Sequence, residues 1–517
     1  MECSYNLLDE PWLPVRLADG QVQQLGLLDT FRRSDEIVAL AATAPPSLVA
    51  QYRLLLAILH RALSQSLPAG WADEERAGWY REGLPVDLVT AYLERWRERF
   101  WLFHPEQPFL QVAALARAEE TRDKRKPWTQ IDLASANGNA PVVFDHACDT
   151  APRAISPAQA LTTLLGFLQF TPGGLVKALR DADKAGALVN TAAILPLGAT
   201  LAQTLALCLH PAPGRQAQED LPAWERPPLT LAELRGEPLL ATGPNDRYTR
   251  QSRAVLLLRE ADGDIRWLHF AAGQALGEDL NALDPMASFR QGTNGLVRLT
   301  FNEGRALWRD LPTLVPTPDG SNQAAAVLEH ALALHLCLDP FAQTHQPLLL
   351  AGLASDQAKL LRWRAEQLRL PLALLAQPER AQALSVQVAR ADQLFGELRG
   401  LASLLLADTL PDSASKDTRS RARSLLDAGP FALSYFAAVE RALPSLYQQL
   451  GEGLFEEADA AWGQVMRRSA EDAWTLLQRG LGSTPRALRA DARFLPRFHG
   501  LLNKAVPKAV THPEASA

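Results

Sequence analysis

The pair of residues nearest to a catalytic arrangement is Asp145-His146, which could act as an acid and a base, with His104 as a third group. Such a pair becomes catalytic only when a nucleophile or a bound metal completes it. The chain has no GxSxG elbow, no HExxH, no GxxxxGK(S/T) loop and no His-Asp dipeptide. A standalone metal-dependent hydrolase that uses Asp145 and His146 is therefore kept as an alternative, and we expect a protein that is not an enzyme.

The other histidines and the cysteines do not suggest a metal site. His330 and His335 are five residues apart on an apolar helix, which differs from the four-residue spacing that places two ligands on one face. The four cysteines lie far apart and make no CxxC pair, at Cys3, Cys148, Cys208 and Cys337. We expect core or surface histidines, reduced thiols, and neither a metal nor a cofactor.

Length and charge limit the class of protein. A chain of 517 residues exceeds the size at which single cores stop growing, so we expect more than one domain. The net charge of −6 means that binding to nucleic acid would need local basic patches. There is no signal-peptide pattern and no apolar run long enough for a bilayer. We expect a soluble, cytoplasmic protein without a membrane partner.

Two local basic patches stand out against this acidic background. Arg122, Lys124, Arg125 and Lys126 lie in a stretch without clear periodicity, and an ordinary solvated charge run is the alternative there. Near the C-terminus, four arginines recur at spacings of three and four, which places them on one helix face: Arg486, Arg489, Arg493 and Arg497. Such a stripe suits non-specific contact with a DNA backbone, and a solvated basic face is equally compatible with the pattern.

The elements that must position these residues form two groups. Helical spacing marks residues 47–66, 86–101, 156–170 and 188–210, whereas residues 254–259, 265–270 and 296–301 have strand character. Four amphipathic stretches then follow at 380–408, 416–450, 452–480 and 485–505. The sequence predicts an α+β fold, with a large mixed N-terminal domain over 1–375 and an all-α four-helix bundle over 380–517.

Four motifs occur in a fixed order along the chain. They are Asn6-Leu7-Leu8-Asp9-Glu10-Pro11-Trp12-Leu13-Pro14-Val15, the Pro-interrupted stretch 100–111 (FWLFHPEQPFLQ), Asn137-Gly138-Asn139 with Phe144-Asp145-His146, and Tyr248-Thr249-Arg250-Gln251-Ser252-Arg253. Together with the helical C-terminal quarter, they resemble the CasA family, the large subunit of the type I-E CRISPR Cascade complex. Each motif alone is weak, whereas their order and the bundle make the resemblance specific.

The resemblance implies a role in antiviral defence within an RNA-guided complex. The family recognises the protospacer-adjacent motif (PAM) in double-stranded DNA, promotes strand separation and R-loop formation, and recruits the helicase–nuclease. Its implied partners are the other Cascade subunits, the CRISPR RNA, the target duplex and the displaced single strand. A helical scaffold without any nucleic-acid role is a further alternative, which only the net acidity supports.

The resemblance also assigns roles to particular residues. Thr171, Pro172, Gly173 and Gly174 correspond to a glycine loop that enters the minor groove, and Lys177, one helical turn later, to a phosphate contact. A helix C-cap is the alternative for this Pro-Gly segment.

Two further parts of the chain correspond to DNA-contacting positions of the family. Asp356, Gln357 and Ala358 correspond to a wedge hairpin in which the glutamine inserts under the PAM, and a helix N-cap at Ser355-Asp356 is the alternative. Gln274 lies near the position at which some relatives have a lysine that contacts the PAM, so either Gln274 replaces this donor or the contact is absent.

The loop over residues 118–146 corresponds to the part of the family that contacts the rest of the complex near the 5′ end of the guide RNA. Within it, the resemblance assigns polar contacts to Asn137 and Asn139, and an anchoring or stacking contact to Phe144.

Overall fold

The computed structural model describes residues 3–135, 149–211, 219–279, 282–293, 295–302, 304–317, 320, 322–339, 345–356 and 359–506. The chain divides into two compact units. The first, here called the mixed unit, comprises Met1–Gly304, Ala324–Ala342 and Gln346–Arg369. The second, the helical unit, comprises Arg305–Gln323, Gln343–His345 and Leu370–Ala517. The helical unit therefore includes Arg305–Gln323, which a single division near residue 375 does not anticipate.

The N-terminal motif forms strands around a buried tryptophan. β1 (Ser4–Asn6) pairs with β5 (Trp101–Phe103), and β2 (Leu13–Leu17) lies between β3 (Val22–Leu25) and β4 (Ile37–Leu40). The Trp12 ring is buried, and its Nε1 donates to the Leu7 carbonyl at 3.1 Å. This extended conformation agrees with the two prolines of the motif, Pro11 and Pro14, which exclude a helix interior. Helix α1 (Leu27–Arg32) connects β3 to β4.

Helix α2 (Pro45–Ser66) is the centre of the mixed unit, because it is buried on nearly every face. It packs against α4 (Val86–Arg95), α5 (Pro157–Phe170), α6 (Leu201–Cys208) and α9 (Pro244–Thr249). The helices expected over 47–66 and 156–170 are confirmed. The helix expected over 86–101 stops at Arg95, since a 3-10 turn, η1 (Arg97–Arg99), and β5 follow. The other helices of this unit are α3 (Asp73–Glu82), α8 (Leu231–Leu234) and α10 (Ala326–Leu338), with 3-10 turns η2 (Ala113–Ala116), η3 (Trp128–Ile131) and η4 (Ala223–Glu225).

The prediction of one buried helix over 188–210 is wrong. Residues Ala192–Pro196 form strand β9, and only Leu201–Cys208 form a helix, α6. Pro196 and Gly198 separate the two elements, and a Cβ on Gly198 would lie 2.3 Å from Cβ of Gln203. The apolar composition of the segment is shared by buried strands and buried helices, so periodicity did not distinguish them.

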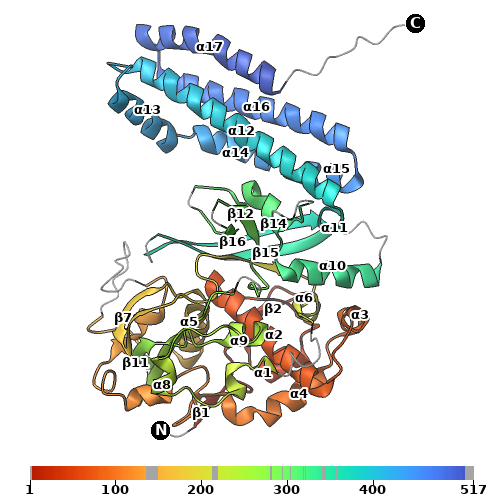
Figure 1. Ribbon diagram of the computed structural model, residues 1–517, viewed down its shortest axis with the longest axis vertical. Helices are drawn as coiled ribbons and strands as arrows, with labels where there is room; N and C mark the ends of the chain where they lie inside the picture. Colours follow the sequence, from red (N-terminus) through yellow and green to blue (C-terminus); the bar gives the residue numbers. More distant parts are fainter. Residues whose placement is uncertain are drawn as a thin grey trace. The chain divides into compact units, whose positions relative to one another are not determined.

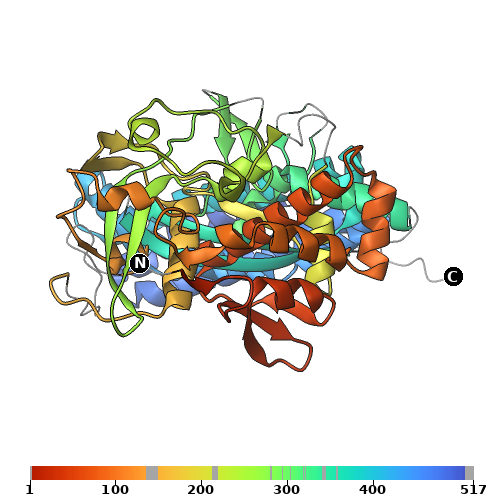
Figure 2. The ribbon, with the colours of Figure 1, turned by 90° about the horizontal axis from the view of Figure 1, so that it is seen from below.

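The remaining strands of the mixed unit form small antiparallel sheets. β10 (Arg253–Arg259) and β11 (Ile265–Ala272) form the long yellow-green ribbon in Figure 2, which β6 (Lys126–Pro127) extends. β16 (Lys359–Pro371), β15 (His345–Asp356) and β9 are neighbours in that order. β7 (Gly174–Ala178) pairs with β8 (Arg180–Asp183), and β12 (Phe289–Gly292) with β13 (Gly295–Arg298). The first two expected strands are confirmed, and the third is shorter than expected.

The helical unit contains α11 (Leu372–Ala376), α12 (Pro378–Thr409), α13 (Lys416–Ala428), α14 (Phe431–Glu440), α15 (Leu443–Glu452), α16 (Phe455–Leu481) and α17 (Pro485–Ala505). η5 (Leu307–Leu314) and β14 (Asn322–Gln323) also belong to it. Helix α12 packs against α13, α16 and α17 (Figure 1). The stretch 416–450 consists of three helices, since Gly429-Pro430 and Pro444 interrupt it. The expected fold class, a mixed region followed by a helical region, is confirmed.

Among the residues that the structure describes, no helix is both long enough and apolar enough to cross a bilayer.

Candidate nucleic-acid interface

The glycine segment after α5 forms an exposed β-hairpin, here called the glycine hairpin (residues 172–183). Helix α5 ends at Phe170, and the N–H of its C-cap Thr171 donates to the Phe167 carbonyl at 2.8 Å. Strand β7 then begins at Gly174, whose φ of +135° favours glycine. Leu175 beside it is 77% exposed. The segment therefore ends a helix and also presents backbone to solvent.

The position of Lys177 differs from the sequence-based expectation. It lies on strand β7 of the glycine hairpin, so it does not follow Gly173 and Gly174 by one helical turn. Its φ is +61°, next to an irregularity in the β7–β8 pairing between Leu175 and Ala178. Its side chain is exposed. A lysine on an exposed strand can still reach a phosphate, but from the hairpin rather than from a helix.

A buried carboxylate supports the base of the glycine hairpin. Asp183, the last residue of β8, pairs with Arg180 at 2.5 Å and with Arg253 at 3.1 Å. Its Oδ2 accepts a hydrogen bond from the Gly273 N–H at 2.7 Å. Burial lowers the pKa of the Arg253 guanidinium, and the Asp183 carboxylate acts in the opposite direction.

The expected third contact, Gln274, lies next to this base. Its backbone N–H donates to the Gln251 carbonyl at 2.8 Å, and its side chain is half-buried. The preceding residue, Gly273, bonds to Asp183 and, through its carbonyl, to Arg180 at 2.7 Å. The structure therefore brings Gln274 to the base of the glycine hairpin, although the two segments are far apart in the sequence.

The three side chains at this base were missed by the sequence analysis. Arg253 belongs to the Tyr248–Arg253 motif, so the motif itself was a signal for it. Arg180 and Asp183 follow the glycine segment without a recognisable pattern. Most of the motif is buried: the Tyr248 carbonyl accepts from Gln169 at 3.0 Å, and Ser252 donates to the Leu168 carbonyl. The motif therefore joins the end of α5 to the base of the hairpin.

The expected wedge segment lies between two strands. Strand β15 ends at Asp356 and strand β16 begins at Lys359, whereas Gln357 and Ala358 lie outside the described residues. The alternative of a helix N-cap at Ser355-Asp356 is wrong, because strands flank the segment on both sides. Residues 365, 367 and 369 of β16 are exposed while the residues between them are half-buried, which is the period of a strand.

The expected loop contacts Asn137, Asn139 and Phe144 lie outside the described residues, as do Asp145 and His146. The preceding basic residues Arg122, Lys124, Arg125 and Lys126 are exposed.

His104, the third group of the hydrolase alternative, stabilises a turn. Its Nδ1 accepts from the backbone N–H groups of Glu106 and Gln107 at 3.1 and 2.9 Å. Among the described residues, no group of three or more His, Cys, Asp or Glu side chains could hold a metal ion. His335 bonds to Gln346 at 2.8 Å, and His330 is half-buried on α10, so both behave as ordinary packed histidines.

The basic stripe lies on α17, as the spacing predicted. Its four arginines, at positions 486, 489, 493 and 497, are exposed, whereas Ala487, Ala490, Phe494 and Phe498 on the other face are buried. Asp408 on α12 takes part in local contacts, because its carbonyl accepts from Arg486 at 3.2 Å and its carboxylate lies 3.5 Å from Arg493. The arrangement leaves a cationic face that can follow a phosphate backbone.

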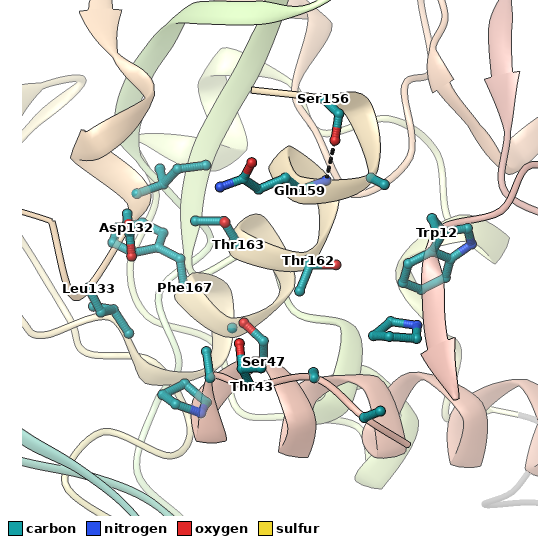
Figure 3. Close-up of a pocket in the computed structure, with 18 of the residues that line it drawn as sticks. Trp12, Thr43, Ser47, Asp132, Leu133, Ser156, Gln159, Thr162, Thr163 and Phe167 are labelled. Atoms are coloured by element: carbon teal, nitrogen blue, oxygen red, sulfur yellow. Dashed lines mark hydrogen bonds between the residues drawn. The ribbon is translucent and has the colours of Figure 1, made fainter. Parts of the chain in front are cut away.

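A pocket of about 490 Å³ lies elsewhere in the mixed unit, between α2 and α5 (Figure 3). Its lining is a mixture of apolar rings, such as Trp12 and Phe167, and hydroxyl groups, such as those of Thr162 and Thr163. The described residues that line it include no lysine or arginine. Phosphate binding relies on cationic side chains, so this pocket does not suit a nucleic-acid backbone.

Comparison with known proteins assigns the chain to a family. The family model of CRISPR-associated protein Cse1 matches residues 6–473. A protein of Thermus thermophilus, CRISPR-associated protein CasA/Cse1, is 34% identical over 514 residues, which cover 97% of both chains.

Solved structures agree with this assignment. The structure of Thermus thermophilus CasA (Cse1) has a TM-score of 0.82 at 31% identity, covering 97% of this chain and 100% of that one. A chain of a CRISPR RNA-guided surveillance complex shares the fold, with a TM-score of 0.71 at 23% identity, over 96% of this chain and 100% of that one. With both its sequence and its fold matched along nearly its whole length, this chain belongs to the Cse1 family of CRISPR-associated proteins.

Proposed function

We propose that this chain is a non-catalytic subunit of a CRISPR RNA-guided surveillance complex and that it recognises the PAM in double-stranded DNA. The observation that carries the proposal is the shared base of the glycine hairpin and the Gly273–Gln274 turn. The backbone of the half-buried Gly173 and the exposed Gly174 can approach base edges where a Cβ would obstruct it. Gln274 offers an amide that can donate to minor-groove acceptors.

Strand opening is assigned to the segment of sequence that links β15 to β16. Asp356 ends one strand, and Gln357 and Ala358 follow it in the sequence before Lys359 begins the next. A side chain inserted at the first base step unstacks it at a cost of a few kcal/mol. Pairing with the guide RNA compensates for this cost further along the target. We therefore assign Gln357 to strand separation and R-loop formation rather than to initial docking.

The cationic face of α17 is assigned to the DNA backbone. Arg486, Arg489, Arg493 and Arg497 are exposed on one face and carry no base-reading geometry of their own. Neutralising them to glutamine should weaken binding equally for duplexes with and without the PAM. The dependence of binding on salt should become shallower by about one unit of slope for each lost phosphate contact.

The first test uses the guide-loaded complex reconstituted with and without this chain. Electrophoretic-shift binding is measured on matched duplexes that differ only in the PAM. A requirement for the chain together with a preference for the PAM supports the proposal, whereas binding that does not change when the chain is added contradicts it. Gly174→Ala and Gln357→Ala then separate recognition from opening: the first should lower docking, and the second should lower reactivity of the displaced strand to permanganate.

Recruitment of the helicase–nuclease, and contact with the other subunits and the CRISPR RNA through Asn137, Asn139 and Phe144, form the remaining part of the proposal. Family membership supports it. Cleavage of a bound target by added helicase–nuclease, compared between complexes with and without this chain, tests the recruitment. Substitution of Phe144 by alanine tests the contact, because the chain should then leave the purified complex on size-exclusion chromatography.

A further inference from the structure

We propose that Asp183, Arg180 and Arg253 form a clamp that holds the glycine hairpin against the Gly273–Gln274 turn, and that these three are positioning residues for PAM discrimination. The inference rests on the proposed function, because it concerns the same site. It goes beyond the proposed function because it makes PAM discrimination depend on buried residues that do not themselves contact DNA. We call these three residues the hairpin clamp.

The first observation is the burial of charge. The Asp183 side chain is 0% exposed, that of Arg253 is 3% exposed and that of Arg180 is 17% exposed. One carboxylate faces two guanidinium groups and also accepts two backbone N–H bonds, from Gly273 at 2.7 Å and from Lys184 at 2.9 Å. A buried ion that is removed leaves its partners unpaired, which costs far more than the loss of an exposed pair. The geometry at Asp183 is therefore strongly determined.

The second observation is that one side chain joins both ends of the hairpin. The Arg253 guanidinium donates to the Pro172 carbonyl at 2.5 Å, just before β7. It also donates to the Lys184 carbonyl at 2.7 Å, just after β8. A planar guanidinium has donors in fixed directions, so it sets the separation and direction of these two backbone segments together. Lysine could not make both bonds with the same geometry.

The third observation connects the hairpin to the turn that carries Gln274. Arg180 donates to the carbonyls of Gly273 at 2.7 Å and Gly236 at 2.9 Å. A Cβ on Gly273 would lie 2.4 Å from the backbone nitrogen of Arg253, so only glycine allows the two backbone segments to approach this closely. The two proposed DNA contacts, the glycine backbone and Gln274, are therefore linked through a rigid polar base.

Ala178 and Leu179 of the hairpin pack against the apolar cluster at β10 and β11, but the part that carries Gly174 has little to fix its position. A two-stranded hairpin is marginally stable alone, and Gly174, Leu175 and Lys177 are exposed. Lys177 and Leu179 also have φ values of +61° and +66°, which non-glycine residues adopt only when the surroundings impose them. Discrimination between base pairs depends on hydrogen-bond distances, so looseness at the base would reduce it before it reduced overall affinity for DNA.

The test substitutes Asp183→Asn in the full chain within the guide-loaded complex. Affinity for a PAM duplex and for a PAM-free duplex gives a preference ratio. We expect this ratio to fall about tenfold or more, because a buried charged partner is lost, while PAM-free binding stays within about twofold. The matched control is Glu225→Gln, whose side chain is 4% exposed and pairs with Arg61 at 2.7 Å outside the hairpin and its base. This control should keep the wild-type ratio.

A milder variant covers the case in which Asp183→Asn does not fold. Arg180→Lys keeps the charge but cannot hold Asp183 and both carbonyls in one plane. Hydrogen exchange of amides 174–183 should become faster in this variant, whereas exchange in α5 should not change, and the preference ratio should fall severalfold. An unchanged ratio in the folded clamp variants, or an equal fall in Glu225→Gln, overturns the inference. If the wild-type complex has no PAM preference, the proposed function fails, and unchanged hairpin exchange in Arg180→Lys then overturns the clamp separately.

Discussion

The mixed unit and the helical unit bury polar groups in different ways. In the mixed unit, Arg53 and Asp284 form a fully buried ion pair at 2.9 Å between residues 231 positions apart. In the helical unit, pairs such as Arg390–Asp459 and Arg399–Asp427 are half-exposed. Its interior is aromatic instead, with rings such as Phe395, Phe436 and Trp462. The mixed unit therefore adds a few buried long-range charged contacts to its apolar core, whereas the interior of the helical unit is apolar packing.

The largest expected effect comes from Asp284→Asn. Removing the carboxylate leaves the Arg53 guanidinium buried with a neutral partner, which should lower the free energy of unfolding of the mixed unit by about 3–5 kcal/mol. Urea denaturation combined with hydrogen exchange in α2 measures it, and exchange in α16 serves as the internal control. A loss below about 1 kcal/mol would break the comparison, since this pair would then behave like a surface pair.

The next largest difference between the two units is expected on acidification, which should lower the stability of the mixed unit more than that of the helical unit. Burial lowers the pKa of His60 to about 3 and that of His330 to about 4, from an ordinary value of 6.5. Both groups stay neutral in the folded mixed unit, while the unfolded chain takes up protons below pH 6.5. Stability should therefore fall as the pH drops from about 6.5 towards 4, by about 1.4 kcal/mol per pH unit for each histidine.

Hydrogen exchange in α2 and in α10 (Ala326–Leu338), followed from about pH 7.5 to about 5.5 with correction for intrinsic exchange rates, detects this loss. His60→Gln should make the decline in α2 shallower. Equal declines in α2 and in α16 would show that the buried histidines do not set the difference between the units.

A smaller effect is expected in the helical unit from Phe498→Leu. The Phe498 ring stacks on Trp474 with centroids 4.4 Å apart, and the substitution loses this aromatic contact while keeping an apolar side chain. The free energy of unfolding of this unit should fall by about 1 kcal/mol. Leu488→Ala, at an exposed position of the same helix, is the control and should be nearly neutral.

The smallest effect is expected from Asp459→Asn, which removes a half-exposed ion pair with Arg390. Exposed pairs contribute about 0–1 kcal/mol, and salt should reduce even that amount. Chemical denaturation at low and high salt measures it. A loss as large as that of Asp284→Asn would show that the helical unit also depends on ion pairs.

Local pattern was sufficient for part of the fold. Helices α2, α5 and α17 and strands β10 and β11 followed from the spacing of apolar residues. Helix α17 buries one face in a regular way, whereas α2 is buried on nearly every face and its length favours a helix. The segment that forms β9 and α6 did not, since it is largely apolar and a single short break, at residues 197–200, divides it.

The candidate site was predictable only in part for a related reason. Glycines 173 and 174 were found as a motif, but the strand conformation of Lys177 was not, because it depends on pairing with β8. The clamp depends on tertiary distance: Asp183 meets Gly273 ninety positions away, and no local pattern marks either residue as a partner of the other. The spacing of apolar residues along the sequence cannot predict charged contacts of this kind.

The helical unit includes Arg305–Gln323, which lies far before its other helices in the sequence, and this has a consequence for the choice of fragments. Trp308 packs against Phe436 and Trp462, and Arg309 pairs with Asp392 at 2.7 Å, yet both residues precede α12 by a long stretch of sequence. A fragment that begins at α12 would lack Trp308, and the parts of Phe436 and Trp462 that Trp308 covers would be exposed to water. Likewise, on the ribosome, Trp308 is synthesised well before the helices that receive it. The helical unit is thus built from separate parts of the chain, and its aromatic interior is complete only after all of them have been synthesised.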